Sequence, residues 1–203
     1  MKKTLATLLL AALMGGSLSA CVPALIGGAA IGTVSATDRR STGAQADDQV
    51  MELRIKETAQ SHLRSKAQTA GFTPKLSVVS YNRQVLLLGL VATEEDKAFV
   101  ERVARAQPAA QKIYNYIEVA QQGRSIGNVA DDSWITSKVR TTLLNVPHAS
   151  PNHVKVVTYN GITYVMGVLT PTEQESVTQV VSTTAGVQKV ITLYQTFDTA
   201  AKY

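Results

Sequence analysis

The stretch VVTYNGITYVMGVLT, Val156 to Thr170, decides the fold of the C-terminal half of this chain. Two runs rich in β-branched residues, Val154 to Tyr159 and Ile162 to Leu169, flank the dipeptide Asn160-Gly161. Asn-Gly between two such runs is the strongest short signal for a β-hairpin, because both residues tolerate the positive φ angles of a type I′ turn. The stretch therefore predicts two antiparallel strands joined by a two-residue turn.

Helix signals lie on both sides of this hairpin. Downstream, Thr170-Pro171-Thr172-Glu173 combines a capping box with a proline at the first helical position, and Gly186 is placed to end that helix. Lys189 to Thr196 then supplies a third strand. Upstream, Asp131 and Asp132 sit where N-terminal caps belong. They precede an i, i+4, i+8 apolar stripe that predicts an amphipathic helix, made of Ile135, Val139 and Leu143.

The same order of signals occurs in the N-terminal half. The segment VVSYNRQVLLLGLV, Val78 to Val91, aligns without a gap with the hairpin described above. The segment QKIYNYIEV, Gln111 to Val119, aligns with QKVITLYQT, Gln188 to Thr196. Both predicted first helices also contain the letters ADD. Three aligned blocks in one order predict two tandem αββαβ units, residues 46–120 and 130–198, joined by a short polar linker at 121–129.

Unit one carries its own helix and strand signals. Thr93 is placed to cap its second helix, and the apolar stripe of its first helix consists of Met51, Ile55 and Ala59. Gly89 and Gly167 interrupt the second strand of each unit, where glycine usually permits a bulge or a close backbone approach. We therefore expect both glycines to be structural.

The first 20 residues have the features of a secretory signal peptide, with Lys2 and Lys3 before an apolar run. Leu18-Ser19-Ala20-Cys21 is similar to a bacterial lipobox, in which the signal is cleaved before the cysteine and the cysteine is acylated. We therefore expect lipidation at Cys21, the sole cysteine. The alternative is an ordinary signal peptide with an incidental cysteine. Val22 stands where an aspartate would resemble an inner-membrane retention signal, which favours the outer membrane.

Residues 21–45 are rich in Gly, Ala, Ser and Thr without helical or strand periodicity, so we expect a flexible lipidated tether. Removal of the signal peptide takes away two lysines, which leaves 18 basic residues against 15 acidic ones and a net charge of +3. This mild surplus suits weak attraction to anionic lipid. Together with export, it argues against a nucleic-acid partner.

Together these features resemble the BON-domain proteins, and the pairing of units resembles the dual BON-domain lipoproteins of Gram-negative outer membranes. The matching stretches are DDSWITSKVRTTLL (131–144), HVKVVTYNG (153–161) and MGVLT (166–170). The resemblance implies an α+β fold in which each unit is a three-stranded mixed sheet packed with two helices. It also implies that the protein binds anionic phospholipid through unit two, supports envelope integrity and is enriched at division sites.

The only tryptophan of the chain distinguishes the first helix of unit two from its counterpart. Helical geometry places it on a face beside the core stripe that also carries a lysine, two hydroxyls and a leucine, with no carboxylate after the predicted cap. Tryptophan is favoured at the bilayer interface, and a nearby cation attracts anionic lipid. We therefore predict a phospholipid-binding face that consists of Trp134, Ser137, Lys138, Thr141 and Leu144.

The corresponding positions of unit one lack these features. They hold no aromatic residue, and Glu57 would be repelled by anionic headgroups; the other residues are Val50, Leu53, Arg54 and Gln60. An alternative placement of Trp134 stays open at this point, in which it packs between the units or against the side of the core.

No residue pattern predicts an enzyme, so we expect no catalytic residue, no metal and no cofactor. His62, His148 and His153 are scattered and lack the spacing of a zinc site, and no nucleophile motif surrounds a serine. A different binding class remains as an alternative to lipid recognition. It is a periplasmic interaction scaffold for envelope or division proteins, which could recruit a peptide at an exposed sheet edge.

Overall fold

The computed structural model describes residues 38–70, 73–120, 123, 125–147 and 149–198. The predicted signal peptide (1–20), the predicted lipidation site Cys21 and the tether up to residue 37 lie outside these residues. Both repeated units lie within one compact part of the chain, Val34–Tyr203.

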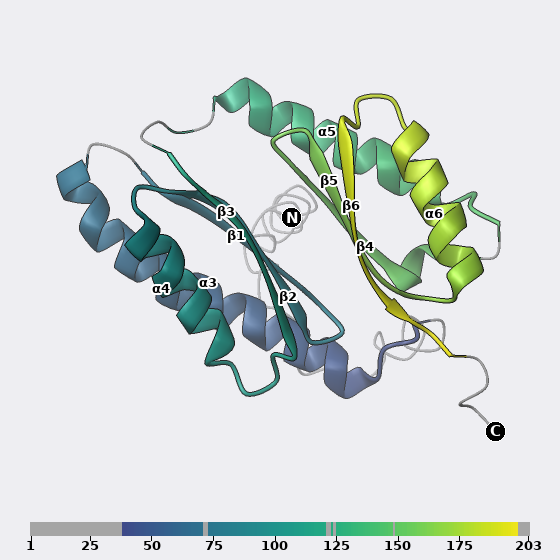
Figure 1. Cartoon of the computed structure of the whole chain (residues 1–203), viewed down its shortest axis with the longest axis horizontal. Helices are drawn as coiled ribbons and strands as arrows, with labels where there is room; N and C mark the ends of the chain where they lie inside the picture. The colour runs from purple at the N-terminus through teal and green to yellow at the C-terminus, as the bar shows by residue number, and fades with distance from the viewer. Residues whose placement is uncertain (1–37, 71–72, 121–122, 124, 148, 199–203) are drawn as a thin grey trace, which may run out of the picture. The chain divides into compact units, whose positions relative to one another are not determined.

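Unit one has the predicted order of elements. Helix α3 (Thr42–Ala70) precedes strands β1 (Lys75–Tyr81) and β2 (Gln84–Val91), which are followed by helix α4 (Glu94–Arg105) and strand β3 (Lys112–Val119). Strand β2 is central, antiparallel to β1 and parallel to β3. The parallel pair requires a crossover, which α4 supplies. Helices α3 and α4 cover one face of this mixed sheet (Figure 1).

Unit two repeats this arrangement. Helix α5 (Ile126–Leu143) and a short 3-10 turn (Pro151–His153) precede the hairpin β4 (Val154–Tyr159) and β5 (Ile162–Leu169). Helix α6 (Pro171–Thr183) then leads to β6 (Lys189–Thr196), parallel to the central β5. Helices α5 and α6 cover one face of this sheet (Figure 1). The predicted α+β fold of two αββαβ units with mixed three-stranded sheets is confirmed.

The local signals for the core and the second helices also hold. Both predicted stripes are buried, with Ile55, Ala59 and Val139 completely inaccessible. Thr93 caps α4, and Thr170 forms the predicted capping box with Glu173 at the start of α6. Helix α6 ends at Thr183, and Gly186 adopts a φ of 101° in the turn that follows.

The faces of the two sheets that carry no helices bury each other. Residues of both units form one cluster, in which the rings of Tyr116 and Tyr164 are 5.0 Å apart. Its fully buried members in unit one are Leu86 and Leu88, and Met166 of unit two is 1% exposed. Each central strand is therefore covered on both faces, which explains its nearly continuous apolar sequence.

The predicted capping role of Asp131 and Asp132 is wrong. Helix α5 begins at Ile126 and is capped by Ser125, whose hydroxyl accepts a hydrogen bond from the Asn128 N–H. The last four residues of the predicted linker 121–129 are therefore helical. Ser41 occupies the same place before α3, which begins at Thr42, so the last four residues of the predicted tether 21–45 are helical too. In both helices the actual N-cap is a serine. The residues between that serine and the predicted start have no apolar periodicity, so the sequence pattern did not indicate a helix there.

The second aspartate of each ADD segment instead binds a hairpin turn. Asp132 accepts hydrogen bonds from the backbone N–H groups of Asn160 and Gly161 at 2.7 and 2.9 Å. Asp48 accepts from those of Asn82 and Arg83, both at 2.7 Å. All four turn residues have positive φ angles. A buried carboxylate thus ties the first helix of each unit to the tip of its hairpin.

The strand glycines allow the predicted close backbone approach. A Cβ atom on Gly89 would lie 2.3 Å from the Lys75 carbonyl oxygen, and one on Gly167 would lie 2.9 Å from that of His153. In both units the clashing carbonyl belongs to the start of the neighbouring antiparallel strand or to the residue just before it.

Candidate functional site

Trp134 lies on the surface of α5. Its side chain is 58% exposed, so the alternative placement in the core or between the units is wrong. One edge of the ring lies near Gly186, in the turn between α6 and β6. Leu144, one residue beyond the helix end, is 64% exposed. The structure therefore leaves two large apolar side chains in solvent at the positions where the sequence places a membrane contact.

Lys138 adds a cation directly beside the tryptophan. Its ammonium nitrogen lies 3.7 Å from the centre of the Trp134 ring, within the range of a cation–π interaction. The same ammonium donates to the Ala185 carbonyl at 3.5 Å. The positive charge is thus held over the exposed ring rather than extended freely into solvent.

The hydroxyl groups of this face are satisfied within the helix. The Ser137 hydroxyl donates to the Ser133 carbonyl at 2.9 Å, and the Thr141 hydroxyl donates to the Ser137 carbonyl at 3.0 Å. Ser133 makes the same bond to Val129 at 2.8 Å. Because each O–H already has an acceptor four residues earlier, the desolvation cost of this stripe is lower than that of free hydroxyls.

The equivalent face of α3 differs in charge and in chemistry. Val50, at the position of Trp134, is 36% exposed, and Leu53 is 51% exposed. Arg54 and Glu57 are exposed beside them. Glu57, whose counterpart in α5 is Thr141, and the missing aromatic ring distinguish this face from that of α5, as the sequence predicts.

Two further exposed residues of α5 lie outside the predicted lipid-binding face. Val129, 39% exposed, precedes the ADD segment and was assigned to the linker. Arg140 is exposed and donates one hydrogen bond, at 3.2 Å, to the Val156 carbonyl on β4. No local sequence signal marks this pairing, because it joins a helix to a strand that follows a loop.

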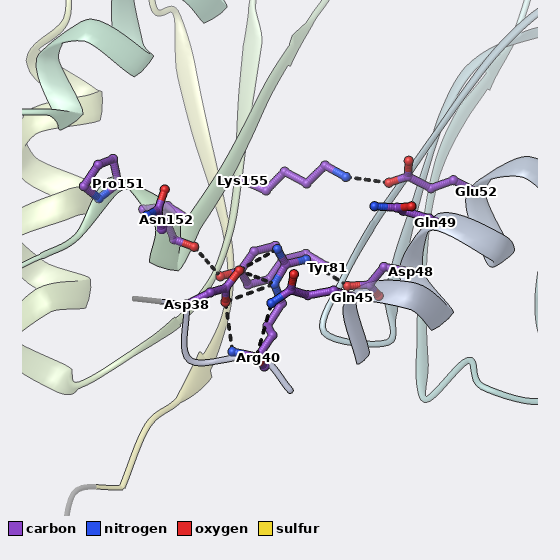
Figure 2. A pocket seen from close by; sticks show the side chains of 11 residues that line it. Asp38, Arg40, Gln45, Asp48, Gln49, Glu52, Tyr81, Pro151, Asn152 and Lys155 are labelled. Atoms are coloured by element: carbon purple, nitrogen blue, oxygen red, sulfur yellow. Dashed lines mark hydrogen bonds and ion pairs between the residues drawn. The ribbon is translucent and has the colours of Figure 1, made fainter. Parts of the chain in front are cut away.

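A polar pocket of about 280 Å³ lies where residues of both units meet (Figure 2). Its charges neutralise one another. The Lys155 ammonium contacts Glu52, and Arg40 forms ion pairs with Asp38 and Asp48. Across the pocket, the Tyr81 hydroxyl donates to the Asn152 carbonyl at 3.2 Å, and burial raises the pKa of Tyr81. The residues that line the pocket therefore make polar contacts between the two units.

Arg39 anchors the end of the predicted tether to unit two. Its guanidinium donates to the Glu173 carboxylate and to the Val168 carbonyl, and it lies 4.2 Å from the centre of the Phe197 ring. Burial of the Glu173 carboxyl opposes ionisation, but hydrogen bonds from Arg39 and Thr170 outweigh it and lower the pKa of Glu173. Adjacent arginines thus bind different units.

Two features are absent from the ranges of the chain that the structure describes. Within those ranges, no cluster of three or more His, Cys, Asp or Glu side chains is arranged to hold a metal ion. No helix there combines the length and the apolar character needed to cross a membrane.

The BON domain family matches residues 52–121 and 131–194. Over 191 residues the chain is 31% identical to outer membrane lipoprotein DolP of Haemophilus influenzae, covering 93% of this chain and 96% of that protein. It is also 31% identical over 154 residues to the 21 kDa hemolysin of Actinobacillus pleuropneumoniae, covering 76% of each.

Among solved structures, the chain is similar to CdsD, a structural protein of the type III secretion system of Chlamydia trachomatis. The TM-score is 0.28 at 16% identity, with 74% of this chain and 66% of that chain covered.

Proposed function

Since this chain belongs to the BON-domain family and is similar over 93% of its length to an outer membrane lipoprotein, we propose that it is lipid-anchored in the outer membrane with its domains in the periplasm, and that its second BON domain binds anionic phospholipid. The contact in this proposal is the exposed face of α5 formed by Trp134, Ser137, Lys138, Thr141 and Leu144. Cys21 carries the lipid anchor, as its lipobox predicts. The BON family and the lipoprotein relative indicate a non-enzymatic family, and the proposed role is accordingly a binding role.

One observation carries the proposal: an exposed tryptophan with a cation held over its ring. Trp134 is 58% exposed, and the Lys138 ammonium lies 3.7 Å from the ring centre. A large apolar side chain gains about 1.5–3 kcal/mol on full burial. A cation near an anionic surface contributes about 1 kcal/mol. The free-energy gain is modest, so α5 suits reversible attachment.

A weak contact becomes effective when an anchor already holds the protein at the bilayer. Lipidation at Cys21 would tether the protein to the membrane. The effective concentration of α5 at the bilayer surface would then be high, so even a weak contact would form. We propose that this double attachment supports envelope integrity and enriches the protein where anionic lipid is abundant, including division sites.

Co-sedimentation with vesicles tests this function. The lipid-free chain from Val22 to Tyr203 is mixed with vesicles of phosphatidylglycerol and phosphatidylcholine, and with vesicles of phosphatidylcholine alone. We expect binding only to the anionic vesicles and weaker binding at high salt, because salt screens the attraction. Trp134→Glu should abolish this binding. Val50→Glu is the matched control, because Val50 holds the equivalent position in α3, and it should bind like wild type.

Intrinsic fluorescence provides a second readout. Trp134 is the only tryptophan, so a blue shift on addition of anionic vesicles would report its burial directly. Equal binding by wild type and a folded Trp134→Glu variant would exclude this face. If wild type stays in solution with every vesicle, the search moves to envelope or division proteins as partners.

A further inference from the structure

A groove extends the α5 face towards β4. It encloses about 260 Å³ between the C-terminal end of the helix and the first strand of unit two. Leu144 belongs both to this groove and to the proposed membrane face. The remaining apolar walls come from Leu143, Pro151, Val154 and Val156. A groove continuous with a membrane-facing surface can receive a part of a lipid that reaches beyond the bilayer surface.

Arg140 places a positive charge at the rim of this groove. Its guanidinium donates one hydrogen bond to the Val156 carbonyl and, among the described residues, forms no ion pair. An arginine side chain has five N–H donors, so donors remain for an anion. Lys155 also lines the groove, but its ammonium contacts Glu52 and donates to the Ser80 carbonyl at 3.0 Å, as Figure 2 illustrates for the Glu52 contact.

We propose that this groove binds a single anionic phospholipid molecule, with the phosphodiester on Arg140 and the first part of an acyl chain between α5 and β4. The inference rests on the proposed function and adds a second lipid site, which shares only Leu144 with the contact face. Guanidinium presents paired donors that match phosphate oxygens. The apolar walls match methylene groups, which an inorganic phosphate or a headgroup alone would leave unused.

This site differs in kind from the tryptophan face. The face requires a bilayer surface, whereas the groove can hold one lipid molecule in free solution. Lys56 stands in α3 where Arg140 stands in α5 and is likewise exposed. Replacement of either residue by glutamine removes the same charge, so the two variants form a matched pair.

The experiment is an NMR titration of the lipid-free chain from Val22 to Tyr203 with dihexanoyl-phosphatidylglycerol below its micelle concentration. We expect amide shifts at Leu143, Leu144 and Val154 to Val156. Arg140→Gln should weaken binding at least five-fold, and Val154→Phe, which fills the half-buried wall, should do the same. Lys56→Gln should bind the monomeric lipid like wild type.

Other outcomes overturn the proposal. Equal affinity for dihexanoyl-phosphatidylcholine would exclude recognition of a net anionic lipid by Arg140. Equal affinity for glycerol phosphate would exclude the acyl-chain contact. Absence of shifts in wild type would exclude the groove even if vesicle binding depends on Trp134, in which case the proposed function stands. If the monomeric lipid causes the expected amide shifts but Trp134→Glu binds vesicles like wild type, the groove is supported and the proposed contact face of α5 is excluded.

Discussion

At the scale of single residues, Asp48 and Asp132 are the most informative positions. Their side chains are nearly inaccessible, and each accepts two backbone N–H groups from a turn in the left-handed region. A buried carboxylate is stable only with such partners, and hydrogen bonds to an ionised acceptor are strong. These aspartates therefore hold α3 and α5 in register with the hairpins beneath them.

Removal of one aspartate tests this role. Asp132→Ala leaves two turn N–H groups without their acceptor, so the free energy of unfolding should fall by about 1–3 kcal/mol. Asp131→Ala alters the exposed neighbour and should change it by less than about 0.5 kcal/mol. Urea denaturation followed by Trp134 fluorescence measures both. Equal effects would contradict the assignment of the turn contact to Asp132.

The lowered pKa of Glu173 predicts a pH dependence of stability. The folded-state pKa lies below the unfolded value of about 4.3, so the carboxylate stabilises the fold above that pH. This contribution is lost as the pH falls through the folded-state pKa. Glu173→Gln should therefore be less stable than wild type at pH 7, and the difference should shrink below about pH 4. Thermal unfolding across pH 2–7 measures it; a constant difference would contradict the linkage.

At the scale of elements, the hairpins depend on two glycines in their central strands. Gly89 and Gly167 leave room for a carbonyl oxygen that a side chain would displace. Both strands are buried on their two faces, so neither can shift to relieve a clash. The closer carbonyl approach is at Gly89, 2.3 Å against 2.9 Å from a built Cβ.

Alanine substitutions should follow this geometry. Gly89→Ala should lower the free energy of unfolding by at least about 1–3 kcal/mol, and Gly167→Ala by less, because overpacking grows with the clash. Gly127→Ala is the control. That glycine lies in α5 with only ordinary contacts around a new Cβ, so alanine should stabilise the helix by about 0.5–1 kcal/mol. Denaturant unfolding of the three variants tests the order.

At the scale of the whole molecule, the two units share a core. Leu86 and Leu88 of β2 turn away from α3 and α4 and pack in one cluster with Tyr164, Met166 and Leu193 of unit two. Polar contacts surround this cluster, including the Lys155–Glu52 ion pair and the hydrogen bond from Asn82 to Gln195 at 2.6 Å. Shared apolar burial makes the stability of each unit depend on the other.

Leu88→Ala tests that dependence. A buried leucine truncated to alanine costs about 2–5 kcal/mol. The only tryptophan lies in unit two, so its fluorescence reports that unit, whereas far-ultraviolet circular dichroism reports both. We expect the variant in unit one to shift the fluorescence transition and the dichroism transition together. Leu53→Ala, at an exposed site of unit one, should shift neither. If Leu88→Ala left the fluorescence transition unchanged, the two units would unfold independently, and the predicted dependence would be wrong.

The sequence by itself determined the elements of this protein, because their signals are local. The Asn160-Gly161 turn, the Thr170 capping box, the apolar stripes and the repeat all act within a few residues, and the structure confirms each of them. Helical periodicity also places Trp134 beside the buried stripe, but only the structure decided that its side chain is exposed.

Tertiary structure alone decided the contacts between distant residues. The local sequence predicts Asp132 as a helix cap, but in the folded protein its carboxylate accepts hydrogen bonds from the backbone of the hairpin turn at Asn160 and Gly161. Arg39 lies in a segment without periodicity, and only the folded unit brings Glu173 to it. The groove beside Arg140 likewise exists only once β4 packs on α5. Local sequence sets backbone preferences within a turn or two, whereas partners for buried charges and walls of cavities are chosen by packing across the whole chain.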